Sequence, residues 1–317
     1  MGWAAMSKRI AVLGGTGFVG QNLLAALKQT RGECFTASRS EGIDLRDPAQ
    51  ARGFLAKSRP DFIINCAAHV GSLNYVTEQA ATVVSDNSRL ILALYEAITA
   101  EAPHAIVVNP IANCAYPADA TTFEEDRWWN GHLHRSVLSY GGTRRMLWVV
   151  AECFQMQHGI RSIHLLVPNM YGPHDSTDPN KAHALNALAA KFVKAKASGQ
   201  GEIVIWGTGV AVREWLYAPD FVRVVREVIE KPDMLGLNEP LNVGQNFGVT
   251  VRELVDLVSR AVGYSGAIRF DPSMPDGAPR KVMDDRRFRK VFPHFEFTAI
   301  DAGLKRTIEY YERIYPY

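Results

Sequence analysis

Near its beginning the chain reads Arg9-Ile10-Ala11-Val12-Leu13-Gly14-Gly15-Thr16-Gly17-Phe18-Val19-Gly20. The continuous apolar run that ends at Leu13 predicts a buried strand, and the apolar periodicity over 18–27 predicts a helix. Glycines recur between them as G-x-x-G-x-x-G, so the backbone can turn tightly and the helix N-terminus can meet an anion. This pattern predicts a dinucleotide phosphate site that is formed by Gly14, Gly17, Phe18, Val19 and Gly20. A glycine turn without a ligand is the alternative interpretation.

Strands and helices alternate along the next part of the chain. Short apolar runs at 34–37, 62–66, 105–109 and 162–167 predict strands, and helical patterns at 48–56, 85–100 and 140–157 separate them. Such alternation is typical of a parallel sheet that is covered by helices on both faces. We therefore expect an α/β fold, a Rossmann-type doubly wound parallel sheet with a smaller C-terminal substrate-binding lobe.

The smaller lobe is expected where turn-forming residues become frequent after Pro168. A helix at 183–197 and a strand at 203–205 follow this loop, whereas a helix at 217–230 and a strand at 241–243 are expected to return to the main sheet. Helices at 249–262 and 299–311 complete the lobe. The predicted division is 1–175 with 215–248 for the dinucleotide-binding domain, and 176–214 with 249–317 for the lobe.

Composition excludes several classes of partner. The formal net charge is +2, and lysines and arginines are scattered, so no basic stripe predicts nucleic acid or an anionic membrane as a partner. The start of the chain, Met1 to Arg9, is too short and too polar for a signal peptide, and no apolar run is long enough to span a membrane. The four cysteines are far apart, which argues against a zinc site or a disulfide framework. We expect a cytoplasmic protein without a bound metal.

The choice of cofactor depends on the end of the second predicted strand, where Ser38-Arg39-Ser40 stands. An acidic residue there would bind a free ribose hydroxyl, whereas an arginine accommodates a 2′-phosphate. Arg39 therefore favours NADP over NAD, unless it is only a solvated loop cation. Asp44 is expected near the adenine, and Ala67, in Cys66-Ala67-Ala68, gives the small side chain that a bound dinucleotide requires nearby.

A tyrosine and a cation share one helix face at Tyr140 and Arg144. A cation four residues after a tyrosine can lower the pKa of the phenol, so that the tyrosine can donate a proton to a carbonyl. By spacing alone, a tyrosine and an arginine four residues apart on a helix would more often be two surface residues.

Several longer tracts give this pair a context, and with them the chain resembles the GDP-L-fucose synthase family, within the extended short-chain dehydrogenases, over nearly its whole length. The tracts are Asn113-Cys114-Ala115-Tyr116-Pro117, Pro168-Asn169-Met170-Tyr171-Gly172-Pro173-His174-Asp175, Trp206-Gly207-Thr208-Gly209, Arg213-Glu214-Trp215 and Asp276-Gly277-Ala278-Pro279-Arg280-Lys281.

The resemblance implies an activity and a set of site residues. Enzymes of this family invert carbons 3 and 5 of a GDP-4-keto-6-deoxy sugar and then reduce carbon 4 with NADPH. The epimerising cysteine and histidine correspond to Cys114 and His183, and the catalytic tyrosine corresponds to Tyr140, with Arg144 beside it. Tyr140, Arg144 and Asn169 are also expected near the cofactor. The residues that the resemblance places in the substrate pocket are Asn169, Lys191, Trp206, Arg213 and Lys281.

Two departures from the family pattern affect the reductive half of this chemistry. The catalytic serine of the family is Ala112 here, and its catalytic lysine is Arg144. Loss of a hydrogen-bond donor to a developing oxyanion costs on the order of 10²–10³ in rate. An arginine keeps the charge, but it does not give up a proton.

Three functions remain open at this point. The chain is expected to be an epimerase and reductase of a GDP-linked 4-keto sugar, in which nearby cations hold Cys114 partly as thiolate. It could instead be an epimerase whose NADP is not consumed, or a protein that binds NADP or a nucleotide sugar without turnover.

A homodimer is also expected, formed by the two long helices at 85–100 and 140–157. Burial against the sheet would explain the apolar residues of these helices equally well. The residues in question are Leu90, Leu94, Met146, Val150 and Phe154.

Overall fold

A six-stranded sheet forms the main body in the computed structural model, which describes residues 8–28, 32–236, 239–274 and 276–317. Its strand order is β10-β5-β4-β3-β1-β2, and all neighbouring strands run parallel. The strands are β1 (Arg9–Leu13), β2 (Glu33–Ala37), β3 (Phe62–Asn65), β4 (Ile106–Ala112), β5 (Arg161–Val167) and β10 (Leu241–Asn242). The predicted Rossmann-type α/β fold is confirmed.

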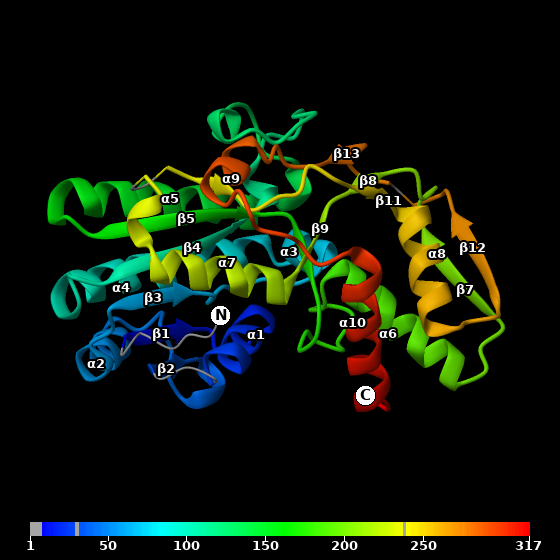
Figure 1. Cartoon of the computed structure of the whole chain (residues 1–317), viewed down its shortest axis with the longest axis horizontal. Helices are drawn as coiled ribbons and strands as arrows, with labels where there is room; N and C mark the ends of the chain where they lie inside the picture. The colour runs from blue at the N-terminus through cyan, green and yellow to red at the C-terminus, as the bar shows by residue number, and fades with distance from the viewer. Residues whose placement is uncertain (1–7, 29–31, 237–238, 275) are drawn as a thin grey trace.

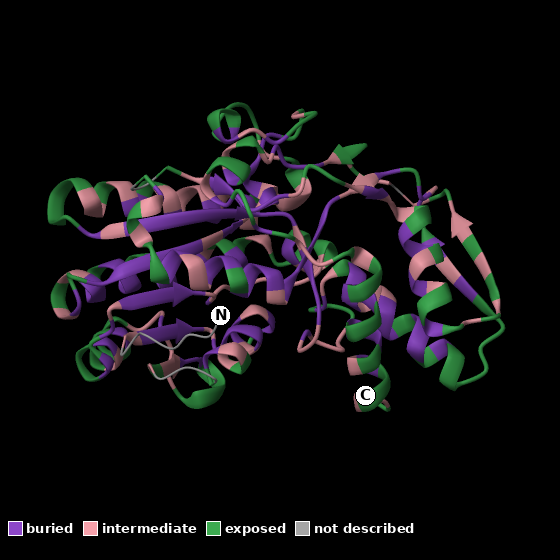
Figure 2. Ribbon diagram, in the orientation of Figure 1, coloured by how far each residue is buried: buried purple, intermediate pink, exposed green. Residues whose placement is uncertain are grey.

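Helices cover both faces of this sheet (Figure 1). One face carries α1 (Phe18–Leu27) and α7 (Ala218–Glu230), and the other carries α2 (Pro48–Ser58), α4 (Ala80–Glu101) and α5 (Leu138–His158). The central strands are buried on both sides (Figure 2), because successive side chains enter opposite cores, as Ile63 and Ile64 do. Burial of one such side chain contributes about 1.5–3 kcal/mol, which explains why these strands are continuously apolar.

The apolar residues of the two long helices could be explained by a dimer interface or by burial against the sheet, and they belong to the sheet core. Leu90, Leu94 and Val150 are buried in the core between the sheet and α2, α4 and α5, and Met146 and Phe154 pack against it. Burial against the sheet, rather than a dimer interface, therefore explains these residues. Other apolar side chains of α4 and α5 remain exposed.

The smaller lobe has an apolar core of its own. Three helices, α6 (Ala184–Ala197), α8 (Val251–Val262) and α10 (Ile300–Ile314), surround it together with the parallel strand pair β7 (Glu202–Trp206) and β12 (Ala267–Asp271). Helix α8 begins at a capping box in which Thr250 and Glu253 bond to each other's backbone N–H groups. Figure 1 shows the lobe beside the main body, with the C-terminus on α10.

Short elements connect the two bodies. Strand β6 (Asn169–Tyr171) pairs with β9 (Trp215–Tyr217), and β8 (Val212–Arg213) pairs with both β11 (Val249–Thr250) and β13 (Arg280–Lys281). Two further helices are α3 (Leu73–Glu78) and α9 (Arg286–Val291). Phe288 of α9 is buried in the core of the main sheet, so this segment packs with the main body although it follows the predicted start of the lobe. The remaining domain boundaries stay a prediction.

Glu214 ties three of these connections together. It lies between β8 and β9 and is fully buried. Its carboxylate accepts hydrogen bonds from the backbone N–H of Gln245 and, at 2.7 Å, from that of Met283. The two amides belong to other segments that join the lobe to the main body, so a single side chain holds them in register.

A membrane-spanning helix and a metal site are both absent from the described residues. No described helix is both long enough and apolar enough to cross a lipid bilayer. Across the described ranges, no three His, Cys, Asp or Glu side chains are grouped as a metal site would require. The expectation about a signal peptide rests mainly on residues 1–7, which lie outside the described residues.

Candidate functional site

The glycine loop between β1 and α1 is shaped by close backbone contacts. Gly14 has φ +73°, and a Cβ there would lie 2.9 Å from backbone atoms of Cys66 and Ala67. A Cβ at Gly20 would collide with the carbonyl oxygen of Gly14. These contacts explain why the loop needs glycine, and they leave the N-terminus of α1, which begins after Gly17, facing the ends of the strands.

A cavity of about 510 Å³ lies above this loop, at the carboxyl ends of β1, β2 and β3. This is where doubly wound sheets bind nucleotides. Of the predicted cofactor residues, Gly14, Gly17, Arg39, Asp44 and Ala67 line it. Phe18, Val19 and Gly20 do not, since Phe18 is buried in the sheet core and Gly20 packs under Gly14. The backbone cradle, the N-terminus of α1 and a lining cation together fit a dinucleotide.

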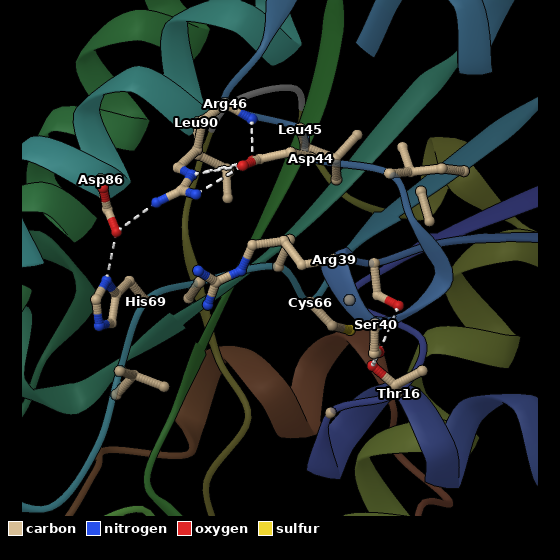
Figure 3. A pocket seen from close by; sticks show the side chains of 18 of the residues that line it. Thr16, Arg39, Ser40, Asp44, Leu45, Arg46, Cys66, His69, Asp86 and Leu90 are labelled. Carbon is tan, nitrogen blue, oxygen red and sulfur yellow. Dashed lines mark hydrogen bonds and ion pairs between the residues drawn. The ribbon is translucent and has the colours of Figure 1, made fainter. Parts of the chain in front are cut away.

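Arg39 begins a single 3₁₀ turn, Arg39–Glu41, directly after β2, and it is exposed. Figure 3 shows its side chain reaching across the cavity. Beside it, the hydroxyls of Thr16 and Ser40 lie 2.8 Å apart, and that of Ser38 donates to Glu41 at 2.6 Å. A guanidinium next to two hydroxyls offers the donors that a phosphate monoester needs.

A charged network that the sequence reasoning missed forms another wall of this cavity. Arg46 binds Asp44 at 2.6 Å and Asp86 at 2.7 Å, and Asp86 also contacts Nδ1 of His69 at 2.7 Å (Figure 3). Hydrogen bonding from Arg46 lowers the pKa of Asp44 to about 2. Arg46 is therefore neutralised by two carboxylates, whereas Arg39 has no such ion pair within the described ranges. Tyr75, on α3, closes the network by contacting Nε2 of His69 at 2.8 Å.

Tyr140 and Arg144 lie one turn apart on α5 and face each other. The guanidinium carbon of Arg144 is 5.0 Å from the centre of the Tyr140 ring. Arg144 is 2% exposed and donates from Nη2 to Asn87 Oδ1 at 3.1 Å, and its Nε has no hydrogen-bond partner among the described residues. Burial raises the pKa of Tyr140, and the charge of Arg144 opposes that rise.

Asn87 connects this pair to the dinucleotide cavity. Its Oδ1 also accepts from the backbone N–H of His69 at 3.0 Å, and its Nδ2 donates to the His69 carbonyl at 2.8 Å. His69 lines the cavity. Through Asn87, Arg144 is thus connected to the same loop that forms a wall of the cofactor site.

Cys114 lies in a 3₁₀ turn, Asn113–Ala115, that directly follows Ala112 at the end of β4. Burial raises the pKa of its thiol to about 11, and the charges of Lys281 and Arg144 only partly offset this effect. Burial therefore acts against the expected thiolate form of Cys114, whereas the two cations favour it. Cys114 also influences the pKa of Tyr140, as does Cys66 in the cavity wall.

Two predicted substrate cations are connected to this thiol. Lys281, on β13, is close enough for its charge to act on both Cys114 and Arg213. Arg213, on the neighbouring strand β8, donates from Nη2 to the Asp276 carbonyl at 3.1 Å. The structure therefore brings together Tyr140, Arg144, Cys114, Lys281 and Arg213.

Lys191 and Trp206 lie in the smaller lobe, and in the described part of the chain no hydrogen bond, ion pair or ring contact joins them to this group. Lys191, on α6, donates to the Val204 carbonyl at 2.7 Å, and Trp206 ends β7 with 60% of its surface exposed. Asn169 donates from Nδ2 to the Glu214 carbonyl at 3.3 Å.

His183 immediately precedes α6 and packs its ring on Phe18, with centroids 5.0 Å apart. In the described part of the chain it has no hydrogen bond or ring contact with Cys114 or Tyr140. Phe18 nevertheless follows Gly17 of the dinucleotide loop, so the imidazole lies beside the cofactor site.

Several of the residues that support this site carry no local sequence signal. Arg145 donates to the carbonyls of Ala115 (2.8 Å) and Trp128 (3.0 Å), and so fixes the loop after Cys114. Its partners are distant in sequence, as are those of Asn87. Two of them stood next to predicted residues, since Arg145 directly follows Arg144 and His69 follows Cys66-Ala67-Ala68, but neither belongs to a motif.

The comparisons with known proteins agree with this geometry. The model of the "NAD dependent epimerase/dehydratase family" matches residues 10–244. A GDP-L-fucose synthase of Escherichia coli (strain K12) is 29% identical over 319 residues, 96% of this chain and 97% of that protein. A GDP-L-colitose synthase of Yersinia pseudotuberculosis is 27% identical over 307 residues, 96% of this chain and 97% of that protein.

Solved structures show the same fold. An NADP-bound GDP-L-fucose synthetase from Naegleria fowleri superposes with a TM-score of 0.85 at 22% identity, over 96% of this chain and 94% of that chain. The predicted resemblance to GDP-L-fucose synthases therefore extends over almost the whole chain. With the glycine loop, the parallel sheet and the family model in agreement, the chain belongs to the NAD dependent epimerase/dehydratase family.

Proposed function

We propose that this protein is an NADP(H)-dependent epimerase and reductase that acts on a GDP-4-keto-6-deoxy sugar. It inverts carbons 3 and 5 and then reduces the ketone at carbon 4. Family membership supports the reaction class, and the GDP-sugar enzymes among its relatives support the substrate class. The observation that carries the proposal is the position of Tyr140, whose ring lies 5.0 Å from the guanidinium of Arg144, which Asn87 connects to His69 in the wall of the dinucleotide cavity.

The cofactor is NADP(H), which supplies the hydride when it is bound. Gly14 and Gly17 receive its pyrophosphate at the N-terminus of α1. Arg39 and Ser40 bind the 2′-phosphate, because Arg39 is the exposed guanidinium that reaches into the cavity. Asp44 and Ala67 form the wall near the adenine.

Proton movements fall to Tyr140, Cys114 and His183. Removal of a proton beside a ketone places negative charge on the carbonyl oxygen, so Tyr140 donates to that oxygen and Arg144 supports the charge. Cys114 and His183 exchange protons with the two faces of the sugar. Because burial raises the pKa of the Cys114 thiol, this group is suited to donate a proton first. The residues that receive the sugar and its pyrophosphate are Asn169, Lys191, Trp206, Arg213 and Lys281.

A second candidate, an epimerase that leaves NADPH unconsumed, is favoured by Ala112 and the buried Arg144. Reduction adds a hydride to carbon and a proton to oxygen, so Tyr140 must receive a new proton in every turnover. Epimerisation removes one proton from each carbon and returns one proton to it, so it needs no net supply of protons. An arginine stabilises charge in both reactions but cannot pass a proton to Tyr140.

Incubation with GDP-4-keto-6-deoxymannose and NADPH in deuterated water distinguishes these functions. The proposed function predicts both deuterium in the sugar and oxidation of NADPH. Deuterium without NADPH oxidation would establish the second candidate. If neither occurs but both ligands still raise the melting temperature, the protein binds its ligands without turnover, and the proposal is wrong.

The protein is further proposed to be a homodimer that forms through α4 and α5. Exposed apolar side chains support this proposal, namely Val84 and Leu92 on α4 and Val149 and Met156 on α5. They are distinct from the buried residues of the same helices.

A further inference from the structure

Asp175 is a buried carboxylate that contacts the predicted catalytic imidazole. Its side chain is 3% exposed. One oxygen, Oδ2, accepts three hydrogen bonds: from the backbone N–H of His183 at 2.8 Å, from Nδ2 of Asn186 at 2.7 Å, and from Nδ1 of His183 at 3.1 Å. The first two bonds hold the start of α6. The third has no part in capping that helix.

The third contact determines which ring nitrogen of His183 carries the proton. Burial acts to raise the pKa of Asp175, but hydrogen bonding and the charge interaction with His183 outweigh it and lower the pKa. The group is therefore a carboxylate, which can only accept. Nδ1 must then be the N–H donor, and Nε2 is left to take up or release a proton.

The surroundings of the ring fix its orientation as well. His183 is about one third exposed and lies against Phe18 of α1 on one side. It stands at the N-terminus of α6, a helix of 14 residues, where the backbone N–H groups disfavour an added positive charge. The carboxylate of Asp175 at this point offsets that effect.

We propose that Asp175 is a positioning residue for His183, which it holds as the Nδ1–H tautomer with Nε2 directed to a ligand beside the glycine loop. The inference rests on the proposed function, in which His183 exchanges a proton with the sugar. Besides holding the start of α6, Asp175 contributes to the reaction only through the ring of His183.

The first test reads the tautomer without any substrate. Nitrogen-15 NMR of the histidine rings, with the His183 signals assigned by their loss in His183→Asn, is expected to show Nδ1 protonated and Nε2 unprotonated above the titration of the ring. In Asp175→Asn the signals should move toward the other tautomer. An Nε2–H tautomer in the unmodified protein would overturn the inference, and this measurement does not depend on whether the variant folds.

The second test measures deuterium entry into GDP-4-keto-6-deoxymannose. Asp175→Asn is expected to slow it by about 10- to 100-fold, a part of what a general acid or base contributes. NADPH binding should be unchanged. Asp178→Asn is the matched control, because Asp178 lies on the same loop and caps the backbone N–H of Asn180 at 2.9 Å, not the imidazole.

A purely structural role for Asp175 predicts a different pattern. The losses of exchange rate caused by Asp175→Asn and by His183→Asn would then add in the double variant. Positioning through His183 instead predicts that the double variant exchanges no more slowly than His183→Asn alone. Additive losses, or exchange at the unmodified rate in Asp175→Asn, would overturn the inference. If the unmodified protein has the Nδ1–H tautomer but exchanges no deuterium, the proposed function and the catalytic part of this inference are both wrong. Only the tautomer assignment would then stand.

Discussion

In the proposed function, Arg144 supplies charge to Tyr140 but cannot renew its proton. Its guanidinium is almost fully buried, stacks near the phenol ring and is hydrogen-bonded to Asn87. The neighbouring strand end offers no hydroxyl, because Ala112 stands there. The charge that assists an enolate is therefore retained, while both donors that would serve reduction are changed.

The double change Ala112→Ser with Arg144→Lys should raise the rate of hydride transfer. A hydroxyl beside the carbonyl oxygen is worth on the order of 10²–10³ in rate, and an ammonium can pass a proton to Tyr140. NADPH oxidation with GDP-4-keto-6-deoxymannose measures the gain, and adding Tyr140→Phe should abolish it. An unchanged rate in a folded double variant would show that the ketone is not held beside these residues.

Arg39 should decide between NADPH and NADH. Arg39→Gln is expected to weaken NADPH binding by about 10- to 100-fold, because a hydrogen bond to a charged group is worth about 1.5–3 kcal/mol. NADH binding should not change, since NADH lacks the 2′-phosphate. Arg52→Gln is the control, because Arg52 pairs with Glu101 on the surface between α2 and α4. Equal losses for both cofactors would contradict this role.

Site residues that belong to a local pattern could be predicted from the sequence. Gly14 and Gly17 belong to the glycine motif, and Arg39 belongs to the segment that follows the second strand. The structure places all three around the cavity. Asn87 could not be found in this way, because its partner Arg144 is 57 positions away and a single asparagine has no distinguishing spacing. The burial of Cys114, which acts against its thiolate form, could not be predicted for a related reason, since burial depends on the tertiary fold. The catalytic roles of the predicted residues stay predictions.

Elements with a strong period of their own were predicted well. The first strand and helix have the expected bounds, and the strands of the main sheet agree to within a few residues. The missed elements include the short β6, β8 and α9, and also the five-residue strand β12. A strand of two or three residues is stabilised by its pairing partner. Strand β6 pairs with β9, and the paired residues Asn169 and Trp215 are 46 positions apart in the sequence. No local pattern could therefore indicate β6.

Glu214 connects segments that are far apart in the sequence. Burial raises the pKa of its carboxyl group to about 7. In the unfolded chain the carboxyl group has its ordinary, lower pKa. The folded state therefore binds the proton more tightly, and the stabilisation from this group is fully present below the unfolded pKa. It is lost as pH rises through about 7, where a buried charge must be held by the amides of Gln245 and Met283.

The free energy of unfolding should consequently fall between about pH 4.5 and pH 7 through this group, by at most about 3 kcal/mol. Glu214→Gln should remove that part of the pH dependence, although it also weakens the two backbone contacts. Urea unfolding at a series of pH values measures both effects, and Glu253→Gln is a control because Glu253 caps α8 at an exposed position. A pH dependence that is identical in Glu214→Gln and the unmodified protein would contradict the raised pKa.

The whole molecule leaves apolar side chains exposed where the two long helices lie side by side. Leu138, Val149 and Met156 are 58%, 38% and 84% exposed on α5, and their spacings of 11 and 7 residues place them on one helix face. Val84 and Leu92 are 43% and 40% exposed on the neighbouring helix α4. Two helices from each of two copies could cover these residues in a symmetric, self-complementary interface.

The homodimer should therefore be disrupted by Leu92→Glu combined with Val149→Glu. Two carboxylates per subunit would lose their hydration at the centre of the interface, and a symmetric arrangement doubles the cost. Sedimentation equilibrium should give twice the chain mass of 35.1 kDa for the unmodified protein and the single mass for the variant. Phe247→Glu is the control, since Phe247 is also an exposed apolar residue, at 58%, but lies in the loop before β11 and should leave the dimer intact. A monomeric mass for the unmodified protein would refute the dimer, and a dimeric mass for the variant would refute this face.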